Sequence, residues 1–443
     1  MKVLMKRIAF LLLAWCGANP AMRGQTYYFT TIAGQAGVIG TADGTNNQAL
    51  FYRPSELVLD TAGALYVSDT LNNTIRKITR VGSDWVVTTI AGVPGVDGSR
   101  DGTNSEAQFY RPNGLAQDQA GNLFVADHYN HTIRKMTPDG TNWVVTTIAG
   151  LARTYGTDDG TNSDARFWSP TGIAVDGTGR ILVVDTAGFT IRMVTPDSTN
   201  WIVTTIAGTP LNYGFQDGLN EAAAYNYPYG IALGPDGASY VTDAGNHAIR
   251  QLKTVAGGWD TATIANFRGE MGSKDGQARK ATFNMPNGIG LDAGTNIYVA
   301  DQSNHTIRKL TSSKGDWDVT TVGGQALVPG SSDGAGTDAR FWMPWGVAVD
   351  NSGALFIADA YNHTIRRGVP MTNTQISLQI AAHGDQVVVS WPVAPEGFQL
   401  ESAASLSAAA GWEAVTNGIV LTGLRYVLTN HVTGSGIFYR LKR

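Results

Sequence analysis

The sequence has 443 residues, of which 43% are apolar and 15% charged, so it can bury a sizeable core and lacks the composition of a disordered chain. Its formal net charge of −4 excludes the basic surface with which proteins bind nucleic acids. Cys16 is the only cysteine, which excludes a disulfide within the chain.

The first residues have the layout of a secretory signal peptide. Basic residues precede an apolar run at 8–14, which is too short to span a membrane, and small residues follow at 17–21. We therefore expect residues 1–24 to be removed and the protein to be secreted, periplasmic or at the cell surface. A lipoprotein acylated at Cys16 is disfavoured, because Trp15 stands where a small residue is normally needed. No later segment is long and apolar enough for a membrane span.

A repeat of 58 residues occupies most of the remaining chain. An arginine recurs at this interval without insertion or deletion, at Arg76, Arg134, Arg192, Arg250, Arg308 and Arg366. An aspartate recurs with it, at Asp69, Asp127, Asp185, Asp243, Asp301 and Asp359. A proline and an Asp-Gly pair keep the same interval, starting at Pro54 and Asp43. Six copies of one unit indicate a repeat architecture.

Each unit contains four short β-rich runs separated by turn-forming residues. In the second unit they read NGLAQD, NLFVAD, HTIRKM and WVVTTIAG. Four strands per unit and six units predict an all-β fold, a six-bladed β-propeller over residues 25–369. The long connector between units, such as residues 34–53, contains segments like SEAQF that we expect to form a single helical turn.

The N-terminal strand is expected to close the ring. A tryptophan opens the fourth strand of five units, and one repeat before Trp85 lies Tyr27, at the start of YYFTTIAG. One repeat after Trp317 the pattern has stopped. Residues 27–33 should therefore complete the last blade, which leaves no open sheet edge there.

The pattern P-x-G-[IVL]-A-x-D, LYVAD and NHTIRK over residues 27–369 resembles the NHL repeat in its long-connector form. This resemblance implies a propeller that is mostly used for binding. Some NHL-like relatives are metal-dependent lyases, and others bind RNA through basic faces.

The repeated polar residues are interpreted as structural. Histidine occurs in four of the six D-x-x-N-H-x-I-R stretches, whereas a catalytic site needs one copy. The Asp and Asn side chains suit turns, and the Arg side chain can bridge carbonyls or carboxylates of neighbouring strands. The repeated Asp-Gly pairs supply too few oxygen atoms per loop for calcium. We therefore predict no catalytic residue, metal site or cofactor.

Positions that vary between units are the candidate ligand-binding residues. Most of them flank the repeated proline near one mouth of the channel. Glu56 stands out because the other units have glycine there, and His128 is a histidine outside the repeated position. The candidates are Tyr52, Arg53, Glu56, Tyr110, Arg111, His128, Trp168, Tyr227, Tyr229, Trp342 and Trp345. Aromatic side chains beside Arg and Asn suit stacking on sugar rings or anchoring a protein partner.

Three functions remain open. The first is a binding scaffold for a glycan or protein at the face formed by the connectors. The second is a lyase or hydrolase at the same channel mouth, using Glu56, Arg53, Arg111 and His128, although no nucleophile motif is present. The third is a structural ring of the cell surface. The sequence does not define the oligomeric state.

A second pattern follows the repeat. After a linker at residues 370–378, short β-rich runs such as QVVVSWPV, RYVLTN and IFYRLKR predict a small β-sandwich-like domain over residues 379–443. It resembles domains that end many secreted bacterial proteins, and a role in attachment or partner binding rests on that analogy alone.

Overall fold

The structure is a computed structural model that describes residues 26–313, 315–371, 379–383, 386–392, 399–403, 413–422, 425–431 and 438–442. The predicted signal peptide and most of the predicted linker lie outside these residues. Strand β30 (Thr364–Met371) reaches two residues into that linker. None of the helices in the described residues is long and apolar enough to cross a membrane.

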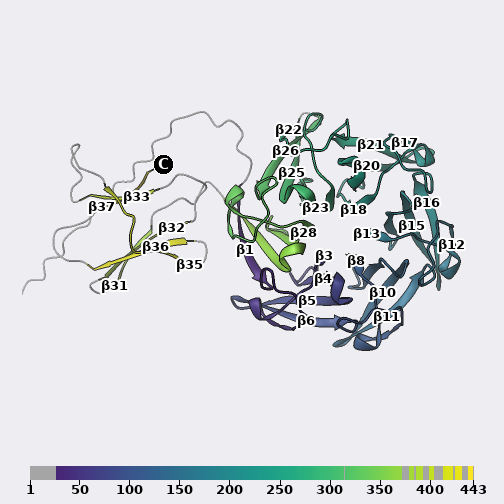
Figure 1. Ribbon diagram of the computed structural model, residues 1–443, viewed down its shortest axis with the longest axis horizontal. Coiled ribbons are helices and arrows are strands. Elements are labelled where there is room, and N and C mark those ends of the chain that lie inside the picture. The colour runs from purple at the N-terminus through teal and green to yellow at the C-terminus, as the bar shows by residue number, and fades with distance from the viewer. Residues whose placement is uncertain are drawn as a thin grey trace, which may run out of the picture.

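Six antiparallel sheets of five strands are arranged around a central channel as a β-propeller (Figure 1). In each blade the strands follow one another from the channel outward. Blade 1 holds β3 (Pro54–Leu59), β4 (Leu65–Asp69), β5 (Thr74–Val81), β6 (Asp84–Ala91) and β2 (Gly44–Thr45). Blade 2 holds β8 (Pro112–Gln117), β9 (Leu123–Asp127), β10 (Thr132–Asp139), β11 (Asn142–Ala149) and β7 (Gly102–Thr103). Blade 3 holds β13 (Pro170–Val175), β14 (Ile181–Asp185), β15 (Thr190–Asp197), β16 (Asn200–Ala207) and β12 (Gly160–Thr161).

The other three blades repeat this order. Blade 4 holds β18 (Pro228–Leu233), β19 (Ser239–Asp243), β20 (Ala248–Val255), β21 (Gly258–Ala265) and β17 (Gly218–Leu219). Blade 5 holds β23 (Pro286–Leu291), β24 (Ile297–Asp301), β25 (Thr306–Ser313), β26 (Asp316–Gly323) and β22 (Gly276–Gln277). Blade 6 holds β28 (Pro344–Val349), β29 (Leu355–Asp359), β30, β1 (Thr26–Ala33) and β27 (Gly334–Ala335). The prediction of four strands per unit was therefore incomplete, because the connector adds a two-residue edge strand to every blade.

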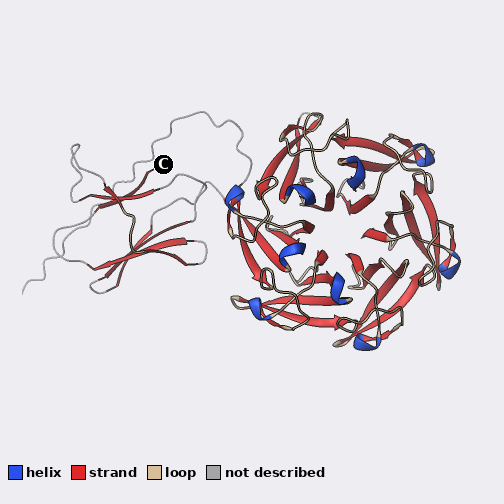
Figure 2. Cartoon of the chain, viewed as in Figure 1, coloured by secondary structure: helices blue, strands red, loops and turns tan. Residues whose placement is uncertain are grey.

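Short 3₁₀ helices mark the connectors and the turns between second and third strands. In the connectors they are η1 (Asn46–Gln48), η3 (Asn104–Glu106), η4 (Asn162–Asp164), η5 (Asn220–Ala222) and η8 (Gly336–Asp338). In the turns they are η2 (Thr70–Asn72), η6 (Ala244–Asn246), η7 (Gln302–Asn304) and η9 (Ala360–Asn362). Figure 2 shows helical turns both at the outer rim and closer to the channel. The helical turn expected in SEAQF is confirmed in part, because η3 contains its first two residues, Ser105 and Glu106.

The N-terminal strand closes the ring, as the sequence predicts. Strand β1 pairs antiparallel with β30, from Thr26 opposite Met371 to Ala33 opposite Ile365. The Asp333 carboxylate accepts hydrogen bonds from the backbone N–H and the hydroxyl of Thr31, at 2.9 and 3.0 Å. The first and last strands of the propeller are thus held in one sheet.

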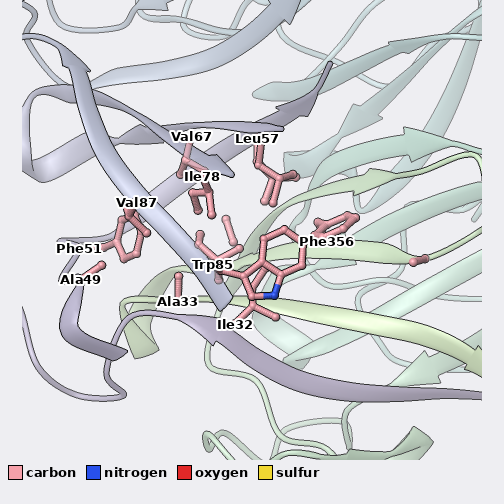
Figure 3. Close-up of a cluster of buried hydrophobic side chains, with 14 residues drawn as sticks. Ile32, Ala33, Ala49, Phe51, Leu57, Val67, Ile78, Trp85, Val87 and Phe356 are labelled. Carbon is pink, nitrogen blue, oxygen red and sulfur yellow. The ribbon is translucent and has the colours of Figure 1, made fainter. Parts of the chain in front are cut away.

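The hydrophobic core lies in the seams between blades. Figure 3 shows the seam between blades 6 and 1, where Trp85 of β6 meets Phe356 of β29 edge to face, with ring centroids 5.9 Å apart. Other fourth strands make the same contact with the preceding blade, as in the pair Trp143 and Tyr66. Because each cluster combines residues of two blades, burial of apolar surface holds the blades together.

A buried arginine in every blade explains the repeated Asp and Asp-Gly positions. Arg134 is fully buried, and its guanidinium contacts Asp127 at 2.8 Å and Asp101 at 2.7 Å. It also donates to the carbonyl oxygens of Gln108 and Arg100. The other five units repeat this network between two carboxylates. The structural interpretation of these residues is confirmed.

The C-terminal region forms two further sheets. One contains β31 (Gln379–His383), β32 (Gln386–Pro392), β36 (Arg425–His431) and β35 (Ile419–Thr422), and the other β34 (Glu413–Ala414), β33 (Gln399–Ala403) and β37 (Phe438–Lys442). Strands of both sheets contribute to one apolar cluster that includes Trp391 and Leu400. The β-sandwich stays a prediction.

Candidate functional site

The connectors and the turns between second and third strands lie on the same face of the propeller. The N–H of Gly95 in a connector donates to the carbonyl of Asn72 in such a turn, and Gly37 does the same to Asn362. We call this surface the connector face. It comprises residues 34–53, 92–111, 150–169, 208–227, 266–285 and 324–343 with the adjoining turns.

The repeated histidines on this face fasten adjacent blades. The Nδ1 atom of His131 accepts a hydrogen bond from the backbone N–H of Ser169 in the next connector, at 3.1 Å. The same bond joins His247 to Met285, His305 to Met343 and His363 to Arg53, and Asn73 supplies it to Arg111. Nδ1 must be unprotonated to accept this bond, and burial lowers the pKa of these histidines. Their role is structural.

His128 likewise has a backbone partner. Its Nδ1 lies 3.1 Å from the carbonyl oxygen of Pro170 in the next blade and donates to it. Thr70 and Thr186, at the same repeat position, donate to the corresponding proline carbonyls at 2.8 Å. The candidate residue His128 is thus an inter-blade contact, and burial lowers its pKa to about 4.

Replacing His128 with Thr should make the protein more resistant to acid. The unfolded chain takes up a proton at His128 below about pH 6.5, whereas the folded protein does so only near pH 4. His128 therefore reduces stability as the pH falls through this interval. Between pH 7 and pH 5 we expect the wild type to lose roughly 1–2 kcal/mol more than the His128→Thr variant, measured by urea unfolding. Equal losses would show that His128 is readily protonated in the folded state.

Two candidate residues, Tyr229 and Trp345, lie together with Asn113 across the channel, and the three come from alternate blades. The Asn113 amide donates to the hydroxyl of Tyr229 at 2.7 Å, and the rings of Tyr229 and Trp345 lie 5.8 Å apart. We call Asn113, Tyr229 and Trp345 the plug. Because they belong to blades 2, 4 and 6, their contacts obstruct the channel at the connector face.

Glu56 lies on the other side of the plug. It lines a cavity of about 280 Å³ that runs along all six inner strands to Leu59 and its counterparts. Its Oε1 accepts a hydrogen bond from the N–H of Leu57 at 3.2 Å, and burial raises the pKa of Glu56 to about 8. In the other blades a side chain here would collide with a carbonyl oxygen of the next inner strand, as at Gly114 with Thr171. This close approach explains the five glycines and makes Glu56 the exception.

Exposed aromatic side chains gather on the connector face. Tyr227 is 52% exposed and Trp342 43% exposed. Trp168 stacks on Tyr155, with centroids 4.7 Å apart and an angle of 29° between the rings. Trp342 also contacts Tyr361, at 5.7 Å.

Arginines extend this aromatic surface. The guanidinium of Arg53 lies 4.1 Å from the ring centre of Tyr361, and that of Arg111 lies 4.6 Å from that of Tyr129. Tyr52 and Tyr110 are half-buried beside His363 and Tyr129. The connector face thus holds eight of the eleven predicted residues, His128 in its turn included, and Tyr229 and Trp345 form part of the plug.

Several exposed or ring-contacting aromatic residues of this face are not among the residues predicted from the sequence. Tyr155 and Tyr213, 60% and 68% exposed, occupy one connector position at which other units have Ile39 and Asp97. Phe189 replaces the repeated histidine and contacts both Tyr213 and Tyr227. A comparison of units along the whole connector would have found them. No group of three or more His, Cys, Asp or Glu in the described part of the chain is placed to hold a metal ion.

A family model for the NHL repeat matches residues 109–136 and 341–367. The chain contains NHL repeats. It is 29% identical, over 71% of its length, to Protein SUPPRESSOR OF QUENCHING 1, chloroplastic, of Arabidopsis thaliana, and 28% identical over 59% to NHL repeat-containing protein 2 of Homo sapiens. The alignments cover 30% and 39% of these relatives, so the chain spans less than half of their length.

Solved structures share the fold of this NHL-repeat chain. A protein of unknown function from Bacteroides thetaiotaomicron has a TM-score of 0.60 at 21% identity, over 78% of this chain and 76% of that one. An auxiliary nutrient binding protein from Bacteroides ovatus has a TM-score of 0.58 at 18% identity, over 79% and 78%. At these identities the likeness concerns the fold alone.

Proposed function

We propose that the protein is an exported binding scaffold whose connector face binds a carbohydrate. The observation that carries this proposal is the set of exposed rings at Tyr155, Tyr213, Tyr227 and Trp342. Flat aromatic faces stack on the apolar faces of sugar rings, and the neighbouring Arg53 and Arg111 supply hydrogen-bond donors for hydroxyl groups. All of these residues occupy positions that vary between units while the frame around them repeats.

Similar folds support a binding role. A structural neighbour is named an auxiliary nutrient binding protein, and NHL repeat-containing protein 2 of Homo sapiens aligns over 59% of the chain. The predicted signal peptide would place the protein where extracellular glycans occur. The C-terminal sheets would then serve as an attachment or positioning module.

A protein partner is the second candidate. Exposed aliphatic side chains lie among the connectors, with Leu211 at 54%, Met271 at 68% and Leu327 at 68% exposure. Exposed apolar surface of this kind is typical of protein interfaces when it is contiguous. The enzymatic alternative is less favoured, because the plug separates Glu56 from the connector face and His128 is bonded to Pro170.

A glycan array probed with the full chain tests the proposal. We expect a defined group of glycans to be retained, and Trp342→Ala and Tyr227→Ala to weaken binding at least about tenfold, or roughly 1.4 kcal/mol each. Val81→Ala is the matched control, since Val81 is 62% exposed at the end of β5, away from the connectors, and should leave binding unchanged. A folded protein that retains no glycan would contradict the carbohydrate proposal and favour a protein partner.

A further inference from the structure

The cavity beneath the plug has the features of a second, separate site. Its volume of about 280 Å³ is close to the lower end of the range for small-molecule sites, roughly 300–1,000 Å³. It is lined by Leu, Val, Ile, Ala and Gly of all six inner strands, with Glu56 and Gln117 as its polar side chains. Tyr229 and Trp345 separate it from the connector face.

Glu56 lacks a compensating charge within this cavity. Its lining contains no Lys, Arg or His, and the hydrogen bond from Leu57 is long at 3.2 Å. An apolar environment disfavours an isolated carboxylate, which is why burial raises the pKa of Glu56. A ligand that brings a positive charge and N–H donors would satisfy this group.

We propose that this cavity binds a small amphiphilic amine, with its ammonium group on the Glu56 carboxylate and its apolar body along the aliphatic inner strands. The size of the cavity limits the body to a short alkyl chain or a single ring. This site faces away from the connectors, so it is independent of carbohydrate binding there.

Binding should depend on pH. Below about pH 8 the amine must displace a proton from Glu56, so the affinity should rise roughly tenfold per pH unit up to about 8. The titratable side chain that interacts with Glu56 from across the channel is Tyr229 of β18, and it stays neutral because burial raises its pKa. Alkylamines remain charged in this range, as lysine does.

The test is calorimetric titration of the full chain with n-hexylamine and with n-hexanol as the uncharged analogue, at pH 6.5 and pH 8. We expect hexylamine to bind more tightly than hexanol, and more tightly at pH 8. Glu56→Gln and Glu56→Gly should lower the affinity for hexylamine at least tenfold and leave the affinity for hexanol unchanged. The glycine variant restores the residue of the other five blades, which keeps the fold. Glu221→Gln, an exposed carboxylate in η5, is the matched control.

Two results would overturn the proposal. One is absence of hexylamine binding to folded wild-type protein at pH 8. The other is equal affinity in the Glu56 variants, which would assign binding to the apolar lining alone. Neither result bears on the glycan array, because the two experiments probe opposite sides of the plug.

Discussion

Replacing Arg134 with Ala is expected to lower the free energy of unfolding by about 3–5 kcal/mol. The substitution leaves Asp127 fully buried without the cation 2.8 Å away and removes the ion pair with Asp101. Two carbonyl oxygens, of Gln108 and Arg100, lose their donor as well. An unpaired buried charge is far more costly than a lost surface contact.

The connector supplies the matched control for this prediction. Arg153 forms an ion pair with Asp97 at 2.9 Å, but both side chains are at least half exposed. Arg153→Ala should therefore change stability by less than about 1 kcal/mol. Denaturant unfolding of both variants decides the point, and similar losses in the two would mean that the buried network is not what stabilises the blades.

Phe29→Ala is also expected to lower the free energy of unfolding by about 3–5 kcal/mol. Phe29 of β1 is fully buried and packs edge to face on Phe341, with centroids 5.1 Å apart. Its ring fills space beside Gly368 and Gly323, where an added Cβ atom would collide with it. In the other five blades the pair corresponding to Phe29 and Gly368 is a Val or Thr opposite Ile, Met, Val or Leu. The closing strand β1 thus has a large side chain, Phe29, opposite a glycine of β30, which has no side chain.

The side-chain sizes at positions 29 and 368 can be changed back to those of the other blades by two substitutions. Phe29→Val combined with Gly368→Leu recreates the pair of Val319 and Leu310 in blade 5, and it should recover most of the stability that Phe29→Val alone loses. Gly368→Leu alone should destabilise by about 1–3 kcal/mol because the new side chain meets Phe29. Additive losses in the double-mutant cycle would show that the two residues do not determine how β1 is held.

The repeat made the fold predictable. Six units of equal length each carry a proline, an aspartate and an arginine, so the blades, their order and the closing strand follow from counting residues. The edge strands such as β2 were missed because a strand of two residues is too short to show the alternation of apolar and polar side chains by which strands are recognised. They are held by contacts that the sequence does not display, including the bonds of Asp43 to Arg76 and Thr89.

The candidate site was harder to predict, because position in a repeat does not reveal how far a side chain reaches. Tyr229 crosses the channel to Asn113, so residues expected at an open mouth form a plug. Glu56 stands one repeat position after the residues of the plug, and it lies on the side of the plug that faces away from the connectors. His128 resembles a catalytic residue in sequence, yet it replaces a threonine that bonds the next blade.

We expect the variable residues of the connector face to bind the ligand and the repeated residues to maintain the frame. The most direct test measures glycan affinity and unfolding free energy for Trp342→Ala and His131→Ala side by side, using a glycan retained on the array. We expect Trp342→Ala to lose about tenfold in affinity with nearly unchanged stability, and His131→Ala to lose about 1 kcal/mol of stability with nearly unchanged affinity. Loss of affinity in His131→Ala with full binding by Trp342→Ala would contradict the account.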